Sequence, residues 1–247
     1  MHVRFHAPGL DPGDDLTVLS AEESGHAVRV LRVRRGAEVR LFNGRGYECA
    51  GLVEAAAPGA VTIRVVGPVG PRPEPRVALM LGQAVLKGDA MDEVVRDAVM
   101  MGVQELRPTV SAHVEADVAR LLRARRHERW QRIAVASAKQ CGRAVVPRVH
   151  EPLAFDGALD TLAAELRLML IEPTEGAPGG SVHGLPSTPC PASAAILVGP
   201  EGGWGEGEVA RARERGWQPL TLGARTLRAD AAAIVAIPVL QFLWNDL

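Results

Sequence analysis

Two glycine-bearing loops are the segments of this sequence best suited to hold a small ligand. The first is GPEGGW at residues 199–204, directly after the apolar run Ala194–Val198, and the second is LGARTLRADAA at residues 222–232. Glycine lets the backbone approach a ligand closely and offer its N–H and C=O groups, which suits an adenine edge or a ribose. Neither loop reads GxGxxG or ends in GKS or GKT, so the common nucleotide motifs are not matched. Taken alone, GPEGGW could equally be a strand-to-helix turn that needs glycine only for its geometry.

Charged side chains in and near these loops are candidates for catalysis. Arg228 offers a guanidinium, a group that stabilises negative charge developing on a ligand's oxygen. Asp230 is a candidate general base, but it could equally cap the helix that begins near it. Asp89, in the upstream segment KGDAMD, is better explained as a helix N-cap than as a catalyst.

The elements that would position these loops follow a break in the sequence at residues 67–75. This segment, GPVGPRPEP, holds four prolines and two glycines in nine residues, so we predict a stiff linker that continues no strand or helix. After it, apolar runs alternate with helical patterns. We predict strands at 77–85, 106–109, 168–171, 194–198 and 219–222, and helices at 89–101, 114–139, 207–215 and from about residue 230. This alternation predicts an α/β fold with a mostly parallel sheet and helices on both faces. Ligands bind at the carboxyl ends of such strands, so both glycine loops would line one crevice.

The residues before the linker have the pattern of a small β domain, which a barrel would satisfy. Short strands are predicted at 17–19, 38–42, 47–56 and 61–66, with Asn43-Gly44 as a hairpin-turn signal. Ser20 followed by Glu23 forms a capping box, which predicts a helix that continues to Leu31.

Basic residues are concentrated in two blocks, although the formal net charge is only −1. Residues 29–45 contain six arginines against Glu38, and residues 120–148 contain nine basic side chains against Glu128. Such blocks can be merely solvated faces, but two of them in a nearly neutral chain favour an RNA partner. The candidate RNA-binding residues are Arg29, Arg32, Arg34, Arg35, Lys87, Arg125, Arg126, Arg129 and Arg143. Arg143 could instead be a cation at a helix C-terminus.

Composition excludes several classes of protein. Hydrophobic residues make up 47% of the 247 and charged residues 23%, which is ordinary for a globular protein and excludes wholesale disorder. Residues 1–10 carry no signal-peptide pattern, and the longest apolar stretch, 231–240, is too short to span a membrane. Three widely separated cysteines fit neither a disulfide framework nor a zinc site. We therefore expect a cytoplasmic protein without a metal.

Four segments, taken together and in order, resemble one family. KGDAMD, QCGR followed by Val146-Pro147, GPEGGW with Glu208 further on, and LGARTLRADAA are similar in order and spacing to the RsmE ribosomal RNA uridine-N3 methyltransferases of the SPOUT superfamily. The resemblance implies a PUA-like β-barrel for RNA binding over residues 1–70 and a SPOUT methyltransferase domain with a trefoil knot over residues 74–247. It further implies a homodimer, S-adenosylmethionine (SAM) as cofactor, and N3 of a uridine in 16S RNA of the small ribosomal subunit as the methylated atom.

The resemblance also implies which residues enclose the cofactor. By position in the motifs these are Ile171, Glu172, Gly199, Pro200, Glu201, Gly202, Gly203, Leu222, Gly223 and Leu227. A branched side chain at Gly202 is expected to occupy ligand space and abolish binding.

The sequence departs from the family pattern in three places. LRADAA stands where the family usually has L-R-x-E-T-A, so the carboxylate of Asp230 is one methylene shorter and a hydroxyl is missing. Gly205 replaces a common serine helix cap, and Ala138-Lys139 replaces a Glu-Gln context, which leaves the role of Lys139 open.

Two other classes of function remain as alternatives at this point. A protein that only binds RNA would keep the basic blocks but would not need paired glycine loops, so cofactor binding distinguishes it. A nicotinamide-dependent oxidoreductase would explain an α/β sheet with glycine loops, but not the missing GxGxxG. Among methyltransferases, the residues themselves do not separate base methylation from ribose 2′-O methylation; only the family resemblance favours N3.

Overall fold

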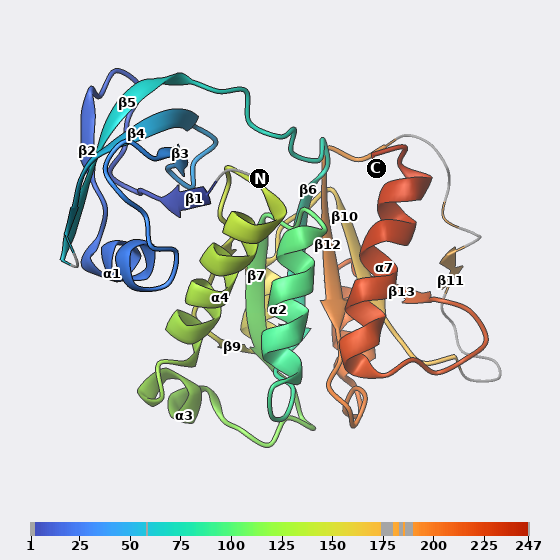
Figure 1. Cartoon of the computed structure of the whole chain (residues 1–247). Helices are drawn as coiled ribbons and strands as arrows, with labels where there is room; N and C mark the ends of the chain where they lie inside the picture. The colour runs from blue at the N-terminus through green and yellow to red at the C-terminus, as the bar shows by residue number, and fades with distance from the viewer. Residues whose placement is uncertain (1–2, 58, 174–179, 183–184, 186–189, 247) are drawn as a thin grey trace. The chain divides into compact units, whose positions relative to one another are not determined.

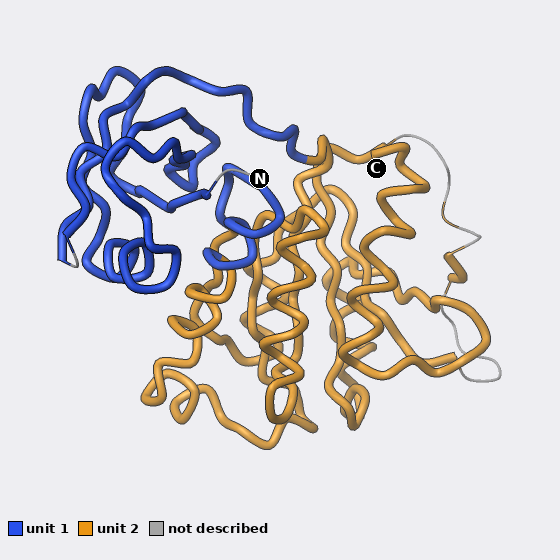
Figure 2. Tube along the Cα trace, in the orientation of Figure 1, with its two compact units in different colours: residues 1–74, 135–146 blue, residues 75–134, 147–247 orange. Residues whose placement is uncertain are grey.

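The computed structural model describes residues 3–57, 59–173, 180–182, 185 and 190–246. The chain forms two compact units, shown in Figure 2. Unit 1 consists of residues 1–74 together with 135–146, and unit 2 consists of residues 75–134 and 147–247. The division between Glu74 and Pro75 falls at the end of the proline-rich segment. Residues 135–146, which are distant along the chain, also belong to unit 1.

Unit 1 is built on a five-stranded sheet. Its strands are β1 (Val3–His6), β2 (Leu16–Val18), β3 (Glu38–Phe42), β4 (Glu48–Ala57) and β5 (Ala60–Pro68), in the order β1-β3-β4-β5-β2. β1 pairs parallel with β3, and the other pairs are antiparallel. Fully buried side chains of these strands, such as Phe5, Leu41 and Ile63, form one hydrophobic core with Ala27 of the helix α1 (Ala21–Arg29). Among the described residues the pairing does not close on itself, so β1 and β2 are the two edges of this sheet.

The start of α1 confirms the predicted cap, whereas two predicted boundaries in unit 1 are wrong. The Ser20 side chain accepts a hydrogen bond from the backbone N–H of Glu23 at 3.2 Å. The helix ends at Arg29 and not at Leu31. The linker was predicted to continue no strand, but Gly67 and Pro68 extend β5 opposite β4. Proline is tolerated there because it is the last residue of the strand.

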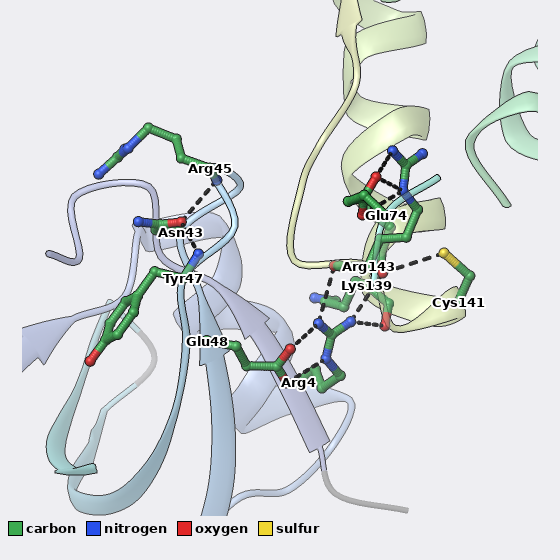
Figure 3. Close-up of polar contacts among 10 residues, drawn as sticks. Arg4, Asn43, Arg45, Tyr47, Glu48, Glu74, Lys139, Cys141 and Arg143 are labelled. Atoms are coloured by element: carbon green, nitrogen blue, oxygen red, sulfur yellow. Dashed lines mark hydrogen bonds and ion pairs between the residues drawn. The ribbon is translucent and has the colours of Figure 1, made fainter. Parts of the chain in front are cut away.

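Residues 135–146 belong to unit 1 because buried polar contacts hold them (Figure 3). The guanidinium of Arg4 donates two hydrogen bonds to the Glu48 carboxylate, at 3.2 and 2.9 Å. It also donates to the carbonyl oxygens of Ala138 and Lys139, each at 3.0 Å, and of Arg143, at 3.1 Å. Carbonyls at a helix C-terminus lack partners within the helix, so Arg4 supplies the donors that this end needs.

Two further ion pairs fix the same segment. The Lys139 ammonium lies 2.8 Å from both carboxylate oxygens of Glu23, and Arg143 pairs with Glu74. The side chain of Arg143 is only 7% exposed. Lys139 and Arg143 are therefore structural cations of unit 1, which resolves the role of Lys139 that the sequence left open.

Unit 2 is built on an eight-stranded sheet in which every pair is parallel, which confirms the predicted α/β class (Figure 1). The order is β11-β13-β10-β12-β6-β7-β8, with β9 beside β7. The strands are β6 (Ala78–Ala84), β7 (Glu105–Val110), β8 (Arg148–Val149), β9 (Leu153–Ala154), β10 (Leu166–Leu170), β11 (Gly180–Ser181), β12 (Ser193–Val198) and β13 (Gln218–Thr221). The helices are α2 (Ala90–Met100), α3 (Val118–Arg123), α4 (Arg126–Cys141), α5 (Phe155–Thr161), α6 (Glu208–Glu214) and α7 (Ala229–Leu243). The last residues of α4 are those that join unit 1.

Helices cover both faces of this sheet. Ala195 and Leu197 of β12 pack with α5 and α6 in one hydrophobic cluster that includes Trp217. Successive side chains of a strand point to opposite faces, so the buried Ile196 faces the other side, where α7 contacts β12 and α2. Gly82 of β6 allows close packing, since a Cβ there would lie 2.5 Å from a methyl of Leu162.

The basic stretch predicted as one helix over 114–139 is two helices. α3 ends at Arg123 and α4 begins at Arg126, and Arg125 between them has a φ of 50°, in the left-handed region that interrupts a helix. Residues 174–191, which are rich in Gly, Pro and Ser, lie largely outside the described residues. Within the part of the chain that the structure describes, no helix has both the length and the apolar character that a membrane span requires.

Candidate active site

A pocket of unit 2 lies at the carboxyl ends of four adjacent strands, β13, β10, β12 and β6. Its volume is about 690 Å³, within the range of pockets that bind small molecules. Three loops supply most of its wall: 170–173 after β10, 198–204 after β12, and 222–232 after β13. Leu86 and Ala90 add the loop that follows β6. The two glycine loops therefore face one crevice, as the strand order requires.

Nearly all of the residues predicted to enclose a cofactor line this pocket. They are Ile171, Glu172, Gly199, Pro200, Glu201, Gly202, Gly203, Leu222 and Leu227. Gly223 is not among the lining residues, but its φ of 121° is accessible chiefly to glycine, so it permits the turn after β13.

The GPEGGW loop is held by its own tryptophan. The indole Nε1 of Trp204 donates to the carbonyl oxygen of Leu170 at 2.7 Å, which ties this loop to the end of β10. A Cβ on Gly199 would lie 3.2 Å from the Trp204 ring, and Gly203 has a φ of 69°. Both glycines are therefore required by the shape of the loop.

A side chain at Gly202 would meet a neighbour that the sequence did not indicate. A Cβ at this position would lie 3.0 Å from the Cβ of His113. Gly202 also lines the pocket, so the predicted loss of ligand binding on substitution stays a prediction. His113 was not singled out from the sequence, because it is far from the glycine loop along the chain.

Gly205 stands where the family commonly has a serine cap, and its backbone N–H donates to the buried carboxylate of Glu208. Glu208, 3% exposed, accepts from the backbone N–H of Gly205 at 2.6 Å and from that of Ala112 at 3.0 Å. A Cβ on Gly205 would lie 2.5 Å from the Cβ of Ala112, so glycine is needed where these two loops meet. Gly207 is the N-cap residue of α6 and makes no side-chain capping hydrogen bond.

Arg228 and Asp230 form a two-point ion pair beside the pocket. Nε and Nη2 of Arg228 donate to Oδ1 and Oδ2 of Asp230 at 3.1 and 2.7 Å. The Asp230 side chain is 18% exposed and that of Arg228 is 83% exposed. Burial acts to raise the pKa of Asp230, but the hydrogen bonds from Arg228 and from the Ala231 amide outweigh it and hold this pKa below its ordinary value.

One of the two predicted helix caps is confirmed. The N-cap residue of α7 is Arg228, and Asp230 lies inside the first turn, where its Oδ1 accepts the N–H of Ala231 at 3.0 Å. Asp89 occupies the N-cap position of α2, as predicted, although its side chain makes no capping hydrogen bond and lies 3.7 Å from Arg129.

Three arginines line the pocket, and sequence reasoning identified only one of them. Arg213 on α6 and Arg225 in the second glycine loop join Arg228, and the carboxylates of Glu172 and Glu201 line the same pocket. The pocket thus offers both charges, with apolar walls from the strand ends. Arg225 lies inside a motif that the sequence had marked, whereas nothing in the sequence distinguishes Arg213 from the other arginines of its helix.

The candidate RNA-binding residues fall into two groups. Arg29, Arg32, Arg34 and Arg35 are exposed around the end of α1 in unit 1. In unit 2, Lys87 lies 2.7 Å from Glu115, Arg125 is paired with Glu128 and Arg129 with Asp92, while Arg126 lies over the Trp130 ring. Arg143 is buried against Glu74, so this geometry does not present it to a phosphate. The residues described contain no group of three or more His, Cys, Asp or Glu side chains that could hold a metal ion.

Comparison with known proteins identifies the family. A model of the RNA methyltransferase domain matches residues 72–241, and a model of the RNA methyltransferase PUA domain matches residues 19–66. Ribosomal RNA small subunit methyltransferase E of Synechocystis sp. is 29% identical over 91% of this chain and 72% of that protein. A methyltransferase of Legionella pneumophila, solved in complex with the cofactor SAM, superimposes with a TM-score of 0.88 at 29% identity over 98% of each chain. The ribosomal RNA small subunit methyltransferase E of Neisseria gonorrhoeae, solved bound to S-adenosyl methionine, gives a TM-score of 0.88 at 27% identity over 99% of this chain and 98% of that one. The chain therefore belongs to the RNA methyltransferase family that includes the ribosomal RNA small subunit methyltransferase E proteins.

Proposed function

We propose that this protein transfers a methyl group from SAM to N3 of a uridine in the RNA of the small ribosomal subunit, in the cytoplasm. The observation that carries the proposal is the convergence of two glycine loops on one pocket, with an arginine fixed beside it. Membership of the family supports the reaction class, and the SAM-bound structures of similar chains support the cofactor. The names of the relatives support the substrate RNA.

The residues of the pocket fit SAM. Its volume of about 690 Å³ accommodates a ligand of that size, and Leu86, Ile171 and Val198 provide apolar surface for a purine. The carboxylates of Glu172 and Glu201 favour a cationic ligand, which suits a sulfonium. When bound, SAM supplies an electrophilic methyl group.

Arg228 is the residue that we assign to the target base. Its side chain is largely exposed at the pocket, where a guanidinium can donate to a uracil carbonyl and stabilise charge as N3 loses its proton. Asp230 holds that guanidinium at two points. A carboxylate whose pKa lies below its ordinary value is a poor proton acceptor, so we assign Asp230 to orienting Arg228 and not to removing the proton.

RNA binding is assigned to the exposed cations of both units. Residues 1–70 would form the PUA-like RNA-binding domain and residues 74–247 the SPOUT methyltransferase domain, with residues 135–146 packed in unit 1. Arg29, Arg32, Arg34 and Arg35 would contact phosphates from unit 1. Lys87, Arg125, Arg126 and Arg129 would do so from unit 2, whereas the burial of Arg143 argues against the same role for it.

We further infer a trefoil knot and a homodimer, as in the SPOUT superfamily that the sequence resembles. β10 lies between β12 and β13, so the connection from β12 to β13, which contains α6, crosses over β10, a path on which a knot can form. α7 leaves Val235 38% and Phe242 71% exposed, and Met100 on the neighbouring α2 is 42% exposed. Burying this apolar face against a second copy would remove it from water.

Two measurements test the proposed function. Calorimetry in the presence of a chelator should give one SAM bound per chain; binding of NAD instead would support the oxidoreductase alternative. Mass-spectrometric nucleoside analysis of small-subunit RNA from cells that lack the protein should show the loss of N3-methyluridine. Loss of a ribose-methylated nucleoside instead would reassign the reaction to the 2′-oxygen, and no loss of any methylated nucleoside would refute the proposal.

A further inference from the structure

The loop after β7 contributes no residue to the pocket wall, yet it contacts the glycine loop that does. β12, β6 and β7 are neighbours in the sheet, so the loops that follow them emerge side by side. Glu208 bridges two of these loops through the N–H groups of Ala112 and Gly205. Glu201 joins the third by accepting the backbone N–H of Lys87 at 3.0 Å. Glu201 therefore ties the GPEGGW loop to the loop after β6, and Glu208 ties Gly205, the residue after the GPEGGW loop, to the loop after β7.

His113 makes the contact in the middle of the loop. Its Nδ1 lies 2.8 Å from the carbonyl oxygen of Gly202 and 3.2 Å from that of Gly203. Both partners are acceptors only, so Nδ1 must carry the hydrogen.

A peptide unit is planar, so the direction of the Gly202 carbonyl also sets the direction of the Gly203 N–H. That N–H donates to the carbonyl oxygen of Pro200 at 3.0 Å. One peptide plane between two glycines is thus held from both sides, at a place where the backbone would otherwise have the most freedom.

We propose that His113 is a positioning residue that holds the Gly202–Gly203 backbone in the shape that binds SAM; this inference rests on the proposed function. Without the imidazole, the two glycines sample more conformations, and ligand binding must restrict them again. The residue does not line the pocket, so we expect its effect to be on affinity. The reaction rate at saturating SAM should remain that of the wild type.

The test compares His113→Ala, His113→Asn and His113→Gln by calorimetric titration with SAM. An asparagine amide can place its N–H near the position of Nδ1, whereas a glutamine amide extends past it. The Kd for SAM should rise about threefold to tenfold in His113→Ala and His113→Gln, the range that one neutral hydrogen bond accounts for. His113→Asn should stay within about twofold of the wild type. In methylation assays the KM for SAM should follow the Kd, while kcat and the KM for RNA stay unchanged.

His150→Ala is the matched control, because it removes an imidazole of unit 2 that pairs with Glu105, 2.8 Å away, and does not line the pocket. Its Kd for SAM should equal that of the wild type. The inference is overturned if His113→Ala binds SAM as the wild type does, or if the Asn and Gln variants behave alike. If the wild type itself fails to bind SAM, the proposed function fails, and the inference with it. Should His113→Ala fold poorly, the comparison of His113→Asn with His113→Gln still decides between these outcomes.

Discussion

Arg4 is the residue of unit 1 whose replacement tests most directly how residues 135–146 are held. Its guanidinium makes two hydrogen bonds to Glu48 and three to carbonyl oxygens at the end of α4. The side chains of Arg4 and Glu48 are 13% and 10% exposed, so neither can recover full hydration in place. Arg4→Met keeps much of the apolar stem and removes every donor.

The expected loss of unfolding free energy follows from the carboxylate of Glu48, which the substitution leaves unpaired. Removing one partner of a buried ion pair leaves an uncompensated charge and typically costs about 3–5 kcal/mol. The partial exposure of both side chains places Arg4→Met near the lower end, about 3 kcal/mol. For a unit of this size, that corresponds to a fall in its melting temperature of roughly 10–20 °C.

The placement of the aromatic residues allows unit 1 to be followed separately. All four tryptophans, at 130, 204, 217 and 244, lie in unit 2. Tryptophan fluorescence therefore reports on unit 2, whereas far-ultraviolet circular dichroism reports on both units. In urea, Arg4→Met should show an early loss of circular dichroism that precedes the fluorescence transition. Coincident transitions at the wild-type midpoint would refute the argument.

A double variant separates the unpaired charge from the lost packing. Arg4→Met combined with Glu48→Leu leaves no buried charge, so it should be at least about 1 kcal/mol more stable than Arg4→Met alone. It should not regain the full stability of the wild type, because the three hydrogen bonds from Arg4 to the carbonyl oxygens of Ala138, Lys139 and Arg143 remain lost. Additive losses in the double variant would show that the pair is not coupled.

Three further predictions concern the site and its partners. Arg228→Ala should lower kcat on the order of a hundredfold at saturating RNA and SAM, with an unchanged Kd for SAM, as for the loss of one oxyanion donor; a normal rate would assign the base to another residue. The pKa of Asp230 is lowered in the folded state, so its contribution to stability is complete above the ordinary value of 3.8 and is lost as the pH falls through the folded pKa. The difference in urea midpoint between the wild type and Asp230→Asn should therefore be present at pH 6 and vanish in strong acid. The double variant Arg32→Gln, Arg35→Gln should weaken RNA binding and leave the affinity for SAM unchanged. The slope of log K against log salt should fall by about 0.7–0.9 for each phosphate that the variant no longer neutralises. An unaltered slope would show that Arg32 and Arg35 do not contact RNA phosphates.

Local patterns were enough to predict most of the elements. The strand at Glu38–Phe42 and the Ser20 cap appear where the alternation and the capping pattern placed them. The parallel sheet follows from alternating strands and helices, and the convergence of two loops follows from the sheet. Such features depend on residues close to one another in sequence, so a sequence alone contains them.

Contacts between distant segments could not be predicted in the same way. Arg4 donates to the carbonyl oxygen of Ala138 in the segment 135–146, and His113 contacts the glycine loop at Gly202. Neither pair has a spacing that signals contact. Arg143 illustrates the consequence: its sequence context allowed a phosphate ligand, whereas its burial against Glu74 gives it a structural role.

The departure at Asp230 can now be explained in terms of the structure. The family usually has a glutamate there, yet the shorter aspartate makes both hydrogen bonds to Arg228 and accepts the N–H of Ala231. Arg228 is the N-cap residue of α7 and Asp230 lies in the first turn, so the two side chains start close together and a short carboxylate suffices. The negative charge also sits where the N-terminus of a helix favours it. The departure therefore preserves the fixed arginine, and with it the feature of this site on which the proposed chemistry depends.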